Sequence, residues 1–347
     1  MGILSIARTK ETFRDKISSQ TLGSQEGIFV AIDNFEKFSM ERFGKVNIIP
    51  DMHKGTEIEV IDTLQAWINF MNANHISPST VTIYFSRVKK YLHYMGIKVN
   101  PEDVKMELEF RRIPKEEKYG LTLDDIQKIF AQFPYNTKVQ FMCQLSSLMR
   151  IGEIAQLRKK HLDSSKTNIV VKIPPEIAKF DKGRTTYFSK EASALLRPRL
   201  RTLSDDDLIF TKNKISHNAG VNAEAKLRRA LIKAGLTMRT STTDRYLINT
   251  HSFRAYGITK LSRHDQNFAK KLAGQKSYMD QYDRLSDDEK LELYEKYEHE
   301  LIVDESKRDK ARIAQLESDK EIEIDSLKQS ILELKNNFKE LQNKKKV

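Results

Sequence analysis

Apolar side chains recur at spacings of three and four through most of this 347-residue chain, the period of a helix with one buried face. One predicted helix ends near residues 72–74, and its apolar stripe consists of Ile61, Leu64, Trp67, Ile68 and Met71. The next is predicted to begin at the N-cap Ser77, with Pro78 at the first helical position, and to end at Gly96. A small helical domain is therefore predicted over residues 56–112.

The period changes only between residues 168 and 188. The runs 168–173 and 184–188 are β-branched or aromatic, and the polar segment between them holds Lys179, Lys182 and Gly183. They predict a short antiparallel hairpin or small sheet. Helical patterns lie on both sides of it, over 122–130, 139–149, 190–200, 222–234, 251–263 and 266–272. The predicted fold class is mainly α with a small antiparallel β-sheet or hairpin.

The remaining segments set the domain boundaries. Residues 1–55 are basic and weakly patterned, so we predict an N-terminal arm or short helices rather than a packed domain. A charged stretch broken by proline and glycine predicts a linker over 113–120, followed by a second domain over 121–303.

The tail, residues 304–347, has its own pattern. Its last half carries an a/d seam with steps of three and four, made of Ile324, Leu327, Ile331, Leu334, Phe338 and Leu341. Upstream, Ile313 keeps the register, whereas Glu317 and Lys320 interrupt it. The pattern predicts a C-terminal coiled coil with a partner through residues 313–341, either another copy or another protein. The alternative is one long helix folded back on its own domain.

The charge distribution favours a polyanionic partner. The chain carries 60 Lys and Arg against 48 Asp and Glu, a net charge of +12. Residues 280–303 have a net charge of −6 and residues 304–347 of +1, which leaves +17 on residues 1–279. Such a surplus favours nucleic acid, because neutralising phosphates releases condensed counterions. The alternative is that the lysines only keep the protein soluble.

Several classes of protein are not favoured. The single cysteine, Cys143, cannot form an internal disulfide. No run approaches the roughly 18 apolar residues of a membrane helix, so we expect a soluble, intracellular protein with no membrane partner. The eight histidines show no pair at metal-ligand spacing, and no Gly-rich phosphate loop is present. We expect no metal and no cofactor.

Two arginines stand out among the residues that can carry chemistry. Arg150 directly follows an apolar helix, where a buried guanidinium needs either the carboxylate of Glu153, three residues on, or a ligand phosphate. Arg254 follows His251 by three residues, so a helix would point both side chains the same way. Taken alone, each pattern is weak.

Two further sequence features indicate a function only when they are considered together with the two arginines. Lys179 lies in the predicted hairpin, where a lysine is ordinarily an exposed charge. Tyr278 and Tyr282 are four residues apart, a spacing that ordinarily indicates core packing on one helix face.

In this chain order, the four pieces resemble the catalytic domain of the tyrosine recombinases, the phage-integrase-like family, and archaeal members in particular. Its strongest elements are MRIGEIAQLRKKHLD at 149–163, which resembles the first arginine box, and THSFRAYGITKL at 250–261, which resembles the H-x-x-R box. The resemblance covers roughly residues 58–300. It implies a DNA-binding core-binding domain over 56–112 and a catalytic domain over 121–303.

The resemblance also implies roles. Arg150 and Arg254 match the two arginines that clamp the scissile DNA phosphate, and Tyr282 matches the nucleophile that forms a 3′-phosphotyrosine link. His251 matches the group that helps activate the tyrosine, and Lys179 the lysine that protonates the departing 5′ oxygen. The resemblance implies no metal, because fixed cations meet the charge that builds on phosphorus. It implies no ATP, because the phosphotyrosine link keeps the energy of the broken phosphodiester.

Two departures from the family pattern leave alternatives open. The family usually has Gly-His shortly before the tyrosine, and this chain has Gly274-Gln275, whose amide donates a hydrogen bond but carries no charge. The spacing to Tyr282 is short, which leaves Tyr278 as a rival nucleophile. Lys182 is likewise a rival to Lys179.

The implied function is a site-specific DNA recombinase, the integrase and excisionase of a mobile element. It would work as a homotetramer on double-stranded attachment sites and be associated with DNA inside the cell. Two alternatives remain: a non-catalytic DNA-binding or architectural protein that retains the fold, and a relaxase like the type IB topoisomerases.

Overall fold

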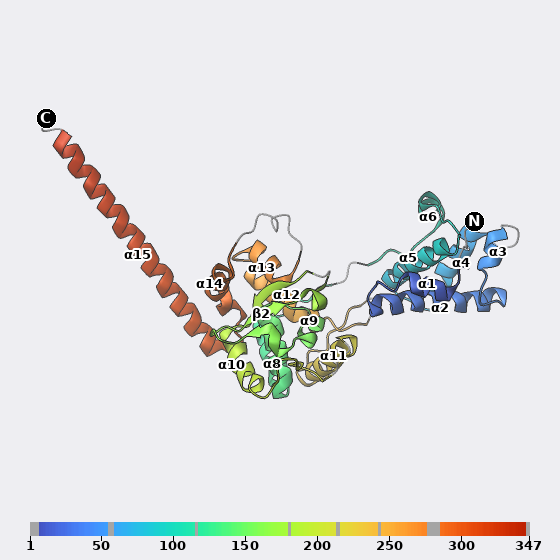
Figure 1. Cartoon of the computed structure of the whole chain (residues 1–347), viewed down its shortest axis with the longest axis horizontal. Coiled ribbons are helices and arrows are strands. Elements are labelled where there is room, and N and C mark those ends of the chain that lie inside the picture. Colours follow the sequence, from blue (N-terminus) through green and yellow to red (C-terminus); the bar gives the residue numbers. More distant parts are fainter. Residues whose placement is uncertain are drawn as a thin grey trace, which may run out of the picture. The chain divides into compact units, whose positions relative to one another are not determined.

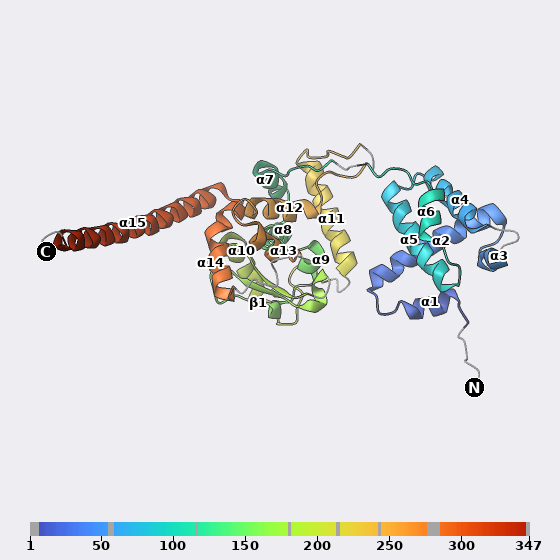
Figure 2. The same ribbon diagram turned by 90° about the horizontal axis from the view of Figure 1, so that it is seen from above.

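The computed structural model describes residues 7–54, 59–114, 117–179, 182–212, 216–241, 244–275 and 285–344. The chain divides into two compact units at residues 116–117 (Figures 1 and 2). Each unit has its own apolar core. Among the helices described, none is both long enough and apolar enough to cross a membrane.

The first unit is entirely helical where it is described. The predicted stripe of α4 is fully buried at Leu64, Trp67, Ile68 and Met71. At the start of α5, the Ser77 hydroxyl accepts a hydrogen bond from the backbone N–H of Thr80, and beyond its end Gly96 has a φ of +99°. Both predicted helices are therefore confirmed. The unit consists of α1 (Lys10–Lys16), α2 (Leu22–Phe43), α3 (Ile49–Lys54), α4 (Val60–Ala73), α5 (Pro78–Tyr94) and α6 (Pro101–Glu107).

The prediction of an arm over residues 1–55 is wrong for residues 10–54. Phe13 of α1 and the α2 residues Ile32 and Phe35 are buried in the same core as α4 and α5. The Phe35 ring meets the Trp67 ring edge-on at 5.1 Å, and the Trp67 Nε1–H donates to Asn34 Oδ1 at 2.9 Å. The physical reason is that α2 buries an apolar stripe and carries its charged residues on the opposite face, so that charged residues throughout the segment do not exclude a packed helix.

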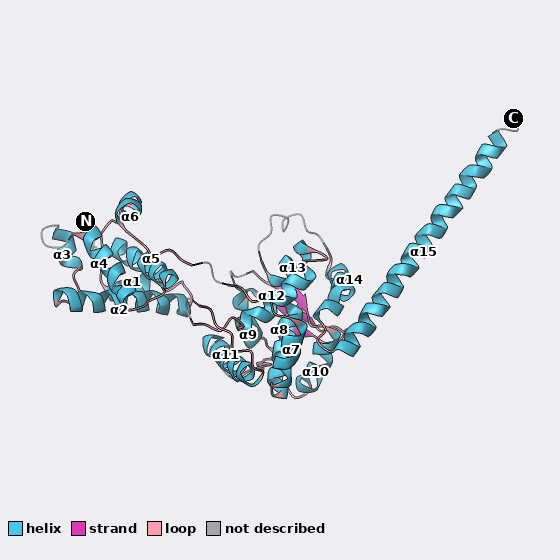
Figure 3. Ribbon diagram, turned by 180° about the vertical axis from the view of Figure 1, so that it is seen from behind, coloured by secondary structure: helices cyan, strands magenta, loops and turns pink. Residues whose placement is uncertain are grey.

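The second unit combines helices with one small sheet (Figure 3). Three antiparallel strands lie in the order β1-β2-β3, with Val171 opposite both Leu162 and Thr186. The predicted small sheet is confirmed, and the two-residue strand β1 is an addition to it. The elements before α14 are α7 (Leu123–Ala131), α8 (Tyr135–Ser147), α9 (Ile151–Gln156), β1 (Leu162–Asp163), β2 (Val170–Ile173), β3 (Arg184–Tyr187), α10 (Lys190–Leu200), α11 (Ser216–Lys233), α12 (Thr250–Leu261) and α13 (Gln266–Ala273).

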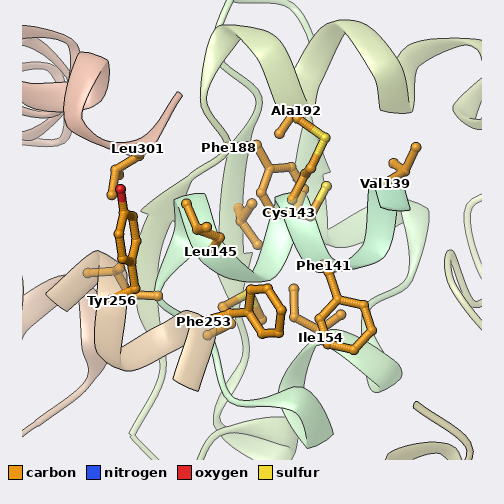
Figure 4. Packing of buried hydrophobic residues seen from close by; sticks show 14 of the residues in the cluster. Val139, Phe141, Cys143, Leu145, Ile154, Phe188, Ala192, Phe253, Tyr256 and Leu301 are labelled. Carbon is orange, nitrogen blue, oxygen red and sulfur yellow. The ribbon is translucent and has the colours of Figure 1, made fainter. Parts of the chain in front are cut away.

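Helix α8 lies in the core of this unit (Figure 4). All its residues from Val139 to Ser147 are buried, and Cys143 is fully buried. The Phe253 ring of α12 lies 5.0 Å from the Phe141 ring. At Gly257, one turn further along α12, an added Cβ would lie 2.7 Å from the Leu145 carbonyl oxygen, so the two helices are in close contact there.

The acidic segment that the structure describes over residues 285–303 packs on its own unit. In α14 (Asp287–Tyr297), Tyr294 is fully buried and its hydroxyl donates to the Ser146 carbonyl at 3.0 Å. The short helix η5 (Glu298–Leu301) continues this packing, because Leu301 is buried in the same core. The long helix α15 (Glu305–Lys344) follows.

Candidate active site

The first arginine is held by the way α8 ends. Leu148 is fully buried and has a φ of +56°, a left-handed conformation that costs energy for a leucine. This turn ends α8 and makes Arg150 the N-cap of α9. The Arg150 backbone N–H donates to Glu153 Oε2 at 2.9 Å, and its Nη1 donates to Glu153 Oε1 at 2.9 Å. The pair with Glu153 considered from the sequence is thus present, yet a quarter of the Arg150 side chain stays exposed.

A third arginine completes this network. Arg184 of β3 donates to Glu153 at 2.7 and 3.3 Å, and its Nε donates to the Leu272 carbonyl of α13 at 2.9 Å. The Glu153 side chain is only 3% exposed. Burial alone raises the pKa of Glu153, but hydrogen bonds and positive charge from Arg184 and Arg150 lower it below its usual value. No local pattern around Arg184 indicates this role, because only the fold brings β3 to α9.

The second predicted arginine, Arg254 of α12, is 1% exposed. Its Nη1 donates to the Leu148 carbonyl, and its Nη2 donates to the Ala273 carbonyl at 2.6 Å. Its Nε is buried and has no hydrogen-bond partner among the described residues. The guanidinium is thus fixed by the backbone carbonyls of Leu148, at the end of α8, and of Ala273 in α13, and within the described part of the chain no carboxylate bonds to it.

The site carries more positive than negative charge. The pKa of Arg254 is lowered to about 10, first by burial and then by the charges of Arg150 and Arg184, while Glu153 opposes the shift. Arg254 therefore stays protonated at neutral pH. The described site holds three guanidinium groups but only one carboxylate, that of Glu153. This surplus of positive charge is suited to binding an anion.

His251 and Lys179 belong to the same neighbourhood. His251 lies exposed in the first turn of α12, which is capped by the Asn249 side chain. The pKa of His251 is lowered by partial desolvation and then by the positive charges of Arg254, Arg150 and Lys179. The fold therefore brings together four side chains that the sequence places up to about 100 residues apart. At neutral pH the imidazole is mainly neutral, so it can accept a proton. Both Lys179 and its rival Lys182 are exposed.

The structure describes the tyrosine segment only up to Gln275. Gly274 ends α13 with a φ of +62°, and the Gln275 backbone N–H donates to the Lys270 carbonyl at 2.9 Å. An added Cβ at Gly274 would lie 2.8 Å from Arg184 Nη1, so this turn packs directly on the arginine network. The Gln275 side chain is exposed. Tyr278 and Tyr282 both lie outside the described residues.

A separate histidine cluster lies at the base of α15. The fold brings ligand atoms of His264, His299 and Glu300 within 4.8 Å of one another, which the spacing of histidines in the sequence does not reveal. However, Glu300 also forms ion pairs with Lys260 at 3.4 Å and Arg308 at 3.5 Å. Two permanent cations already neutralise this carboxylate and would repel a metal ion, so the cluster is better explained as a structural ion-pair network.

Comparisons with known proteins agree with this geometry. Residues 120–279 match the phage integrase family model. Among curated proteins, no sequence match was found.

Solved structures share the fold at low sequence identity. Lambda integrase, as a dimer bound to a COC′ core site, is 13% identical with a TM-score of 0.55, and the match covers 80% of this chain and 97% of that one. The Tn1549 transposon integrase in complex with transposon right end DNA is 15% identical with a TM-score of 0.55, covering 80% and 94%. The XerH site-specific recombinase bound to difH is 16% identical with a TM-score of 0.53, covering 81% and 82%.

The matched segment contains both arginine boxes. The described part of the network, from Arg150 to Gln275, lies inside residues 120–279. The family match over residues 120–279, the shared fold and the converging arginines lead to the same assignment: this segment is a domain of the phage integrase, or tyrosine recombinase, family.

Proposed function

We propose that this protein is a site-specific recombinase that breaks and rejoins double-stranded DNA through a covalent tyrosine intermediate. The observation that carries the proposal is the convergence of Arg150 and Arg254, from two boxes about 100 residues apart, at a site with surplus positive charge. A DNA phosphate is an anion that planar, bidentate guanidinium groups bind better than lysines do.

In the proposed reaction, Arg150 and Arg254 hold the non-bridging oxygens of one backbone phosphate. The Tyr282 oxygen attacks phosphorus, the bond to the 5′ oxygen breaks, and a 3′-phosphotyrosine forms. His251 accepts the phenol proton, and Lys179 donates a proton to the leaving 5′ oxygen. A 5′-hydroxyl of another strand then attacks the phosphotyrosine and restores the phosphodiester. Charge that develops on the phosphate is met by cations already in place, which lowers the barrier.

The burial of Arg254 supports its place in this scheme. A guanidinium held by two backbone carbonyls does not need to reorganise when the transition state forms. Gln275 would add a neutral hydrogen-bond donor where the family usually has histidine.

The proposal extends to the biological role and the assembly of the protein. We assign the protein to the integration and excision of a mobile element, acting as a tetramer on attachment-site DNA inside the cell. The DNA complexes of the three structural neighbours support a DNA partner. For the tail, we propose self-association through the seam over residues 313–341.

The test is a covalent adduct. The substrate is a nicked suicide duplex. It contains the sequence at the boundary of the mobile element that carries the gene for this protein. Incubation with the full chain should give a slower-migrating protein–DNA band in a denaturing gel. Tyr282→Phe should abolish the band and Tyr278→Phe should retain it. The reverse pattern would transfer the nucleophile to Tyr278.

The non-catalytic alternative is kept by one specific observation, the neutral Gln275 at the end of α13. It predicts salt-sensitive DNA binding without any covalent band. The relaxase alternative predicts relaxation of plasmids that contain no attachment site.

A further inference from the structure

The first four side chains of the α15 seam are largely uncovered by the described residues. Each is half or more exposed: Ile324 at 50%, Leu327 at 56%, Ile331 at 52% and Leu334 at 68%. Large apolar side chains repeated along one face of a charged helix are typical of an interface.

Only the first part of α15 is attached to the second unit. Arg308 pairs with Glu300 at 3.5 Å, and Asp319 pairs with Lys296 of α14 at 3.7 Å. In the part of the helix described beyond Asp319, the side-chain bonds stay within the helix, for example from Lys328 to Asp325 at 2.9 Å. The alternative of a helix folded back on its own domain therefore does not hold for the seam.

We infer that the seam pairs with the same seam of a second copy, as a parallel, in-register, two-stranded coiled coil over residues 321–344. This inference rests on the proposed self-association of the tail and does not depend on strand cleavage. The a positions are Ile324, Ile331 and Phe338, and the d positions are Leu327, Leu334 and Leu341. Two of the three a positions are β-branched, and β-branched residues at a with leucine at d favour two parallel strands.

The flanking charges favour the same arrangement. In a parallel pair, the g position of one helix faces the next e position of its partner, which sets Glu323 against Lys328. Both side chains are exposed. In an antiparallel pair, the e positions of one helix face the e positions of the other. Lys328 and Lys335 occupy two of these positions, so like charges would face each other. The bond from Lys328 to Asp325 is an exposed pair and therefore a weak competitor.

The length of the seam limits its strength. About three heptads is near the lower bound for a stable coiled coil, and the seam residues Glu317 and Lys320 prevent extension upstream. Pairing is therefore expected to be weak between free copies and to strengthen when two copies share one DNA, since the effective concentration of the tails then rises.

The buried native cysteine makes disulfide trapping a sharp test. Cys143 is 0% exposed, so the unmodified chain should give no cross-linked dimer in a glutathione redox buffer. Full-length Leu334→Cys places two thiols opposite each other at a d layer of a parallel pair, within disulfide range. It should give a dimer band several-fold stronger than Gln329→Cys, whose residue lies at the outward f position. Leu327→Cys should behave like Leu334→Cys.

A charge-swap series tests the register. Each of Glu323→Lys and Lys328→Glu, made in the Leu334→Cys chain, should lower the cross-linked fraction, and the double swap should restore it.

Three results would overturn the inference. If Leu334→Cys forms no dimer by itself but forms a disulfide with Ile331→Cys when the two variants are mixed, the pair is antiparallel. Failure of the double swap to restore cross-linking would contradict the register. Equal yields for Leu334→Cys and Gln329→Cys would exclude a seam-specific pair. The covalent DNA band is a separate readout, so its presence or absence leaves this result unaffected.

Discussion

Arg184 makes the shortest hydrogen bond to Glu153, at 2.7 Å, from a nearly buried position, and its loss should be costly. Its side chain is 9% exposed, against 24% for Arg150. In Arg184→Gln, the buried carboxylate keeps only its pair with Arg150, so we expect the free energy of unfolding to fall by about 3–5 kcal/mol at neutral pH. Denaturant unfolding measures this loss. Arg197→Gln is the matched control, because the partly buried Arg197 donates to backbone carbonyls and, among the described residues, to no carboxylate.

The pH dependence of that loss identifies its cause. The pKa of Glu153 is lowered by folding, so its contribution to stability is present above the unfolded pKa and disappears as the pH falls through the folded value. The difference between the unmodified chain and Arg184→Gln should therefore narrow on acidification through the glutamate range. A difference that stays constant with pH would mean that Arg184 acts by packing instead of by charge.

At the scale of elements, the contact between α8 and α12 positions Arg254. An added Cβ at Gly257 would lie 2.4 Å from Leu148 Cδ2 and 2.7 Å from the Leu145 carbonyl oxygen. Gly257→Ala should therefore separate the helices, lower the free energy of unfolding by about 1–3 kcal/mol, and reduce formation of the covalent adduct. Gly220→Ala in α11 is the control: its Cβ meets nothing within 4 Å, and the change should stabilise by about 0.4–1 kcal/mol. Equal effects of both changes would contradict this account.

Elements that carry their own periodic signal were predictable from the sequence, and long-range packing was not. The stripe of α4, the N-cap of α5 and the small sheet each depend on residues within one short segment. The packing of α2 was missed because its burial depends on α4 and α5, not on its composition. Likewise, Arg184 and Gly257 act through residues far away in sequence, and nothing in their local pattern indicates a role.

For the whole molecule, the separation of charge predicts which parts would meet DNA in the proposed reaction. Residues 1–279 carry a net charge of +17, whereas residues 280–303, which include α14, carry −6. Like charges repel, so α14 should face away from the phosphates. Beyond Asp319 the tail interleaves seven basic with five acidic residues, which leaves little net attraction for a duplex.

Deletion of residues 320–347 should therefore leave the salt dependence of non-specific DNA binding nearly unchanged. The logarithm of the binding constant falls against the logarithm of salt concentration with a slope of about −0.9 for each phosphate neutralised. Fluorescence anisotropy on an arbitrary duplex measures that slope. The protein concentration is kept in the range where light scattering shows a monomer, so that pairing of the tails does not contribute. The deleted and full chains should agree to within about one phosphate, because the deletion removes a net charge of only +2. If the slope of the deleted chain corresponds to several fewer neutralised phosphates, the tail binds DNA directly. Binding of the tail to the duplex would then compete with pairing of the two seams.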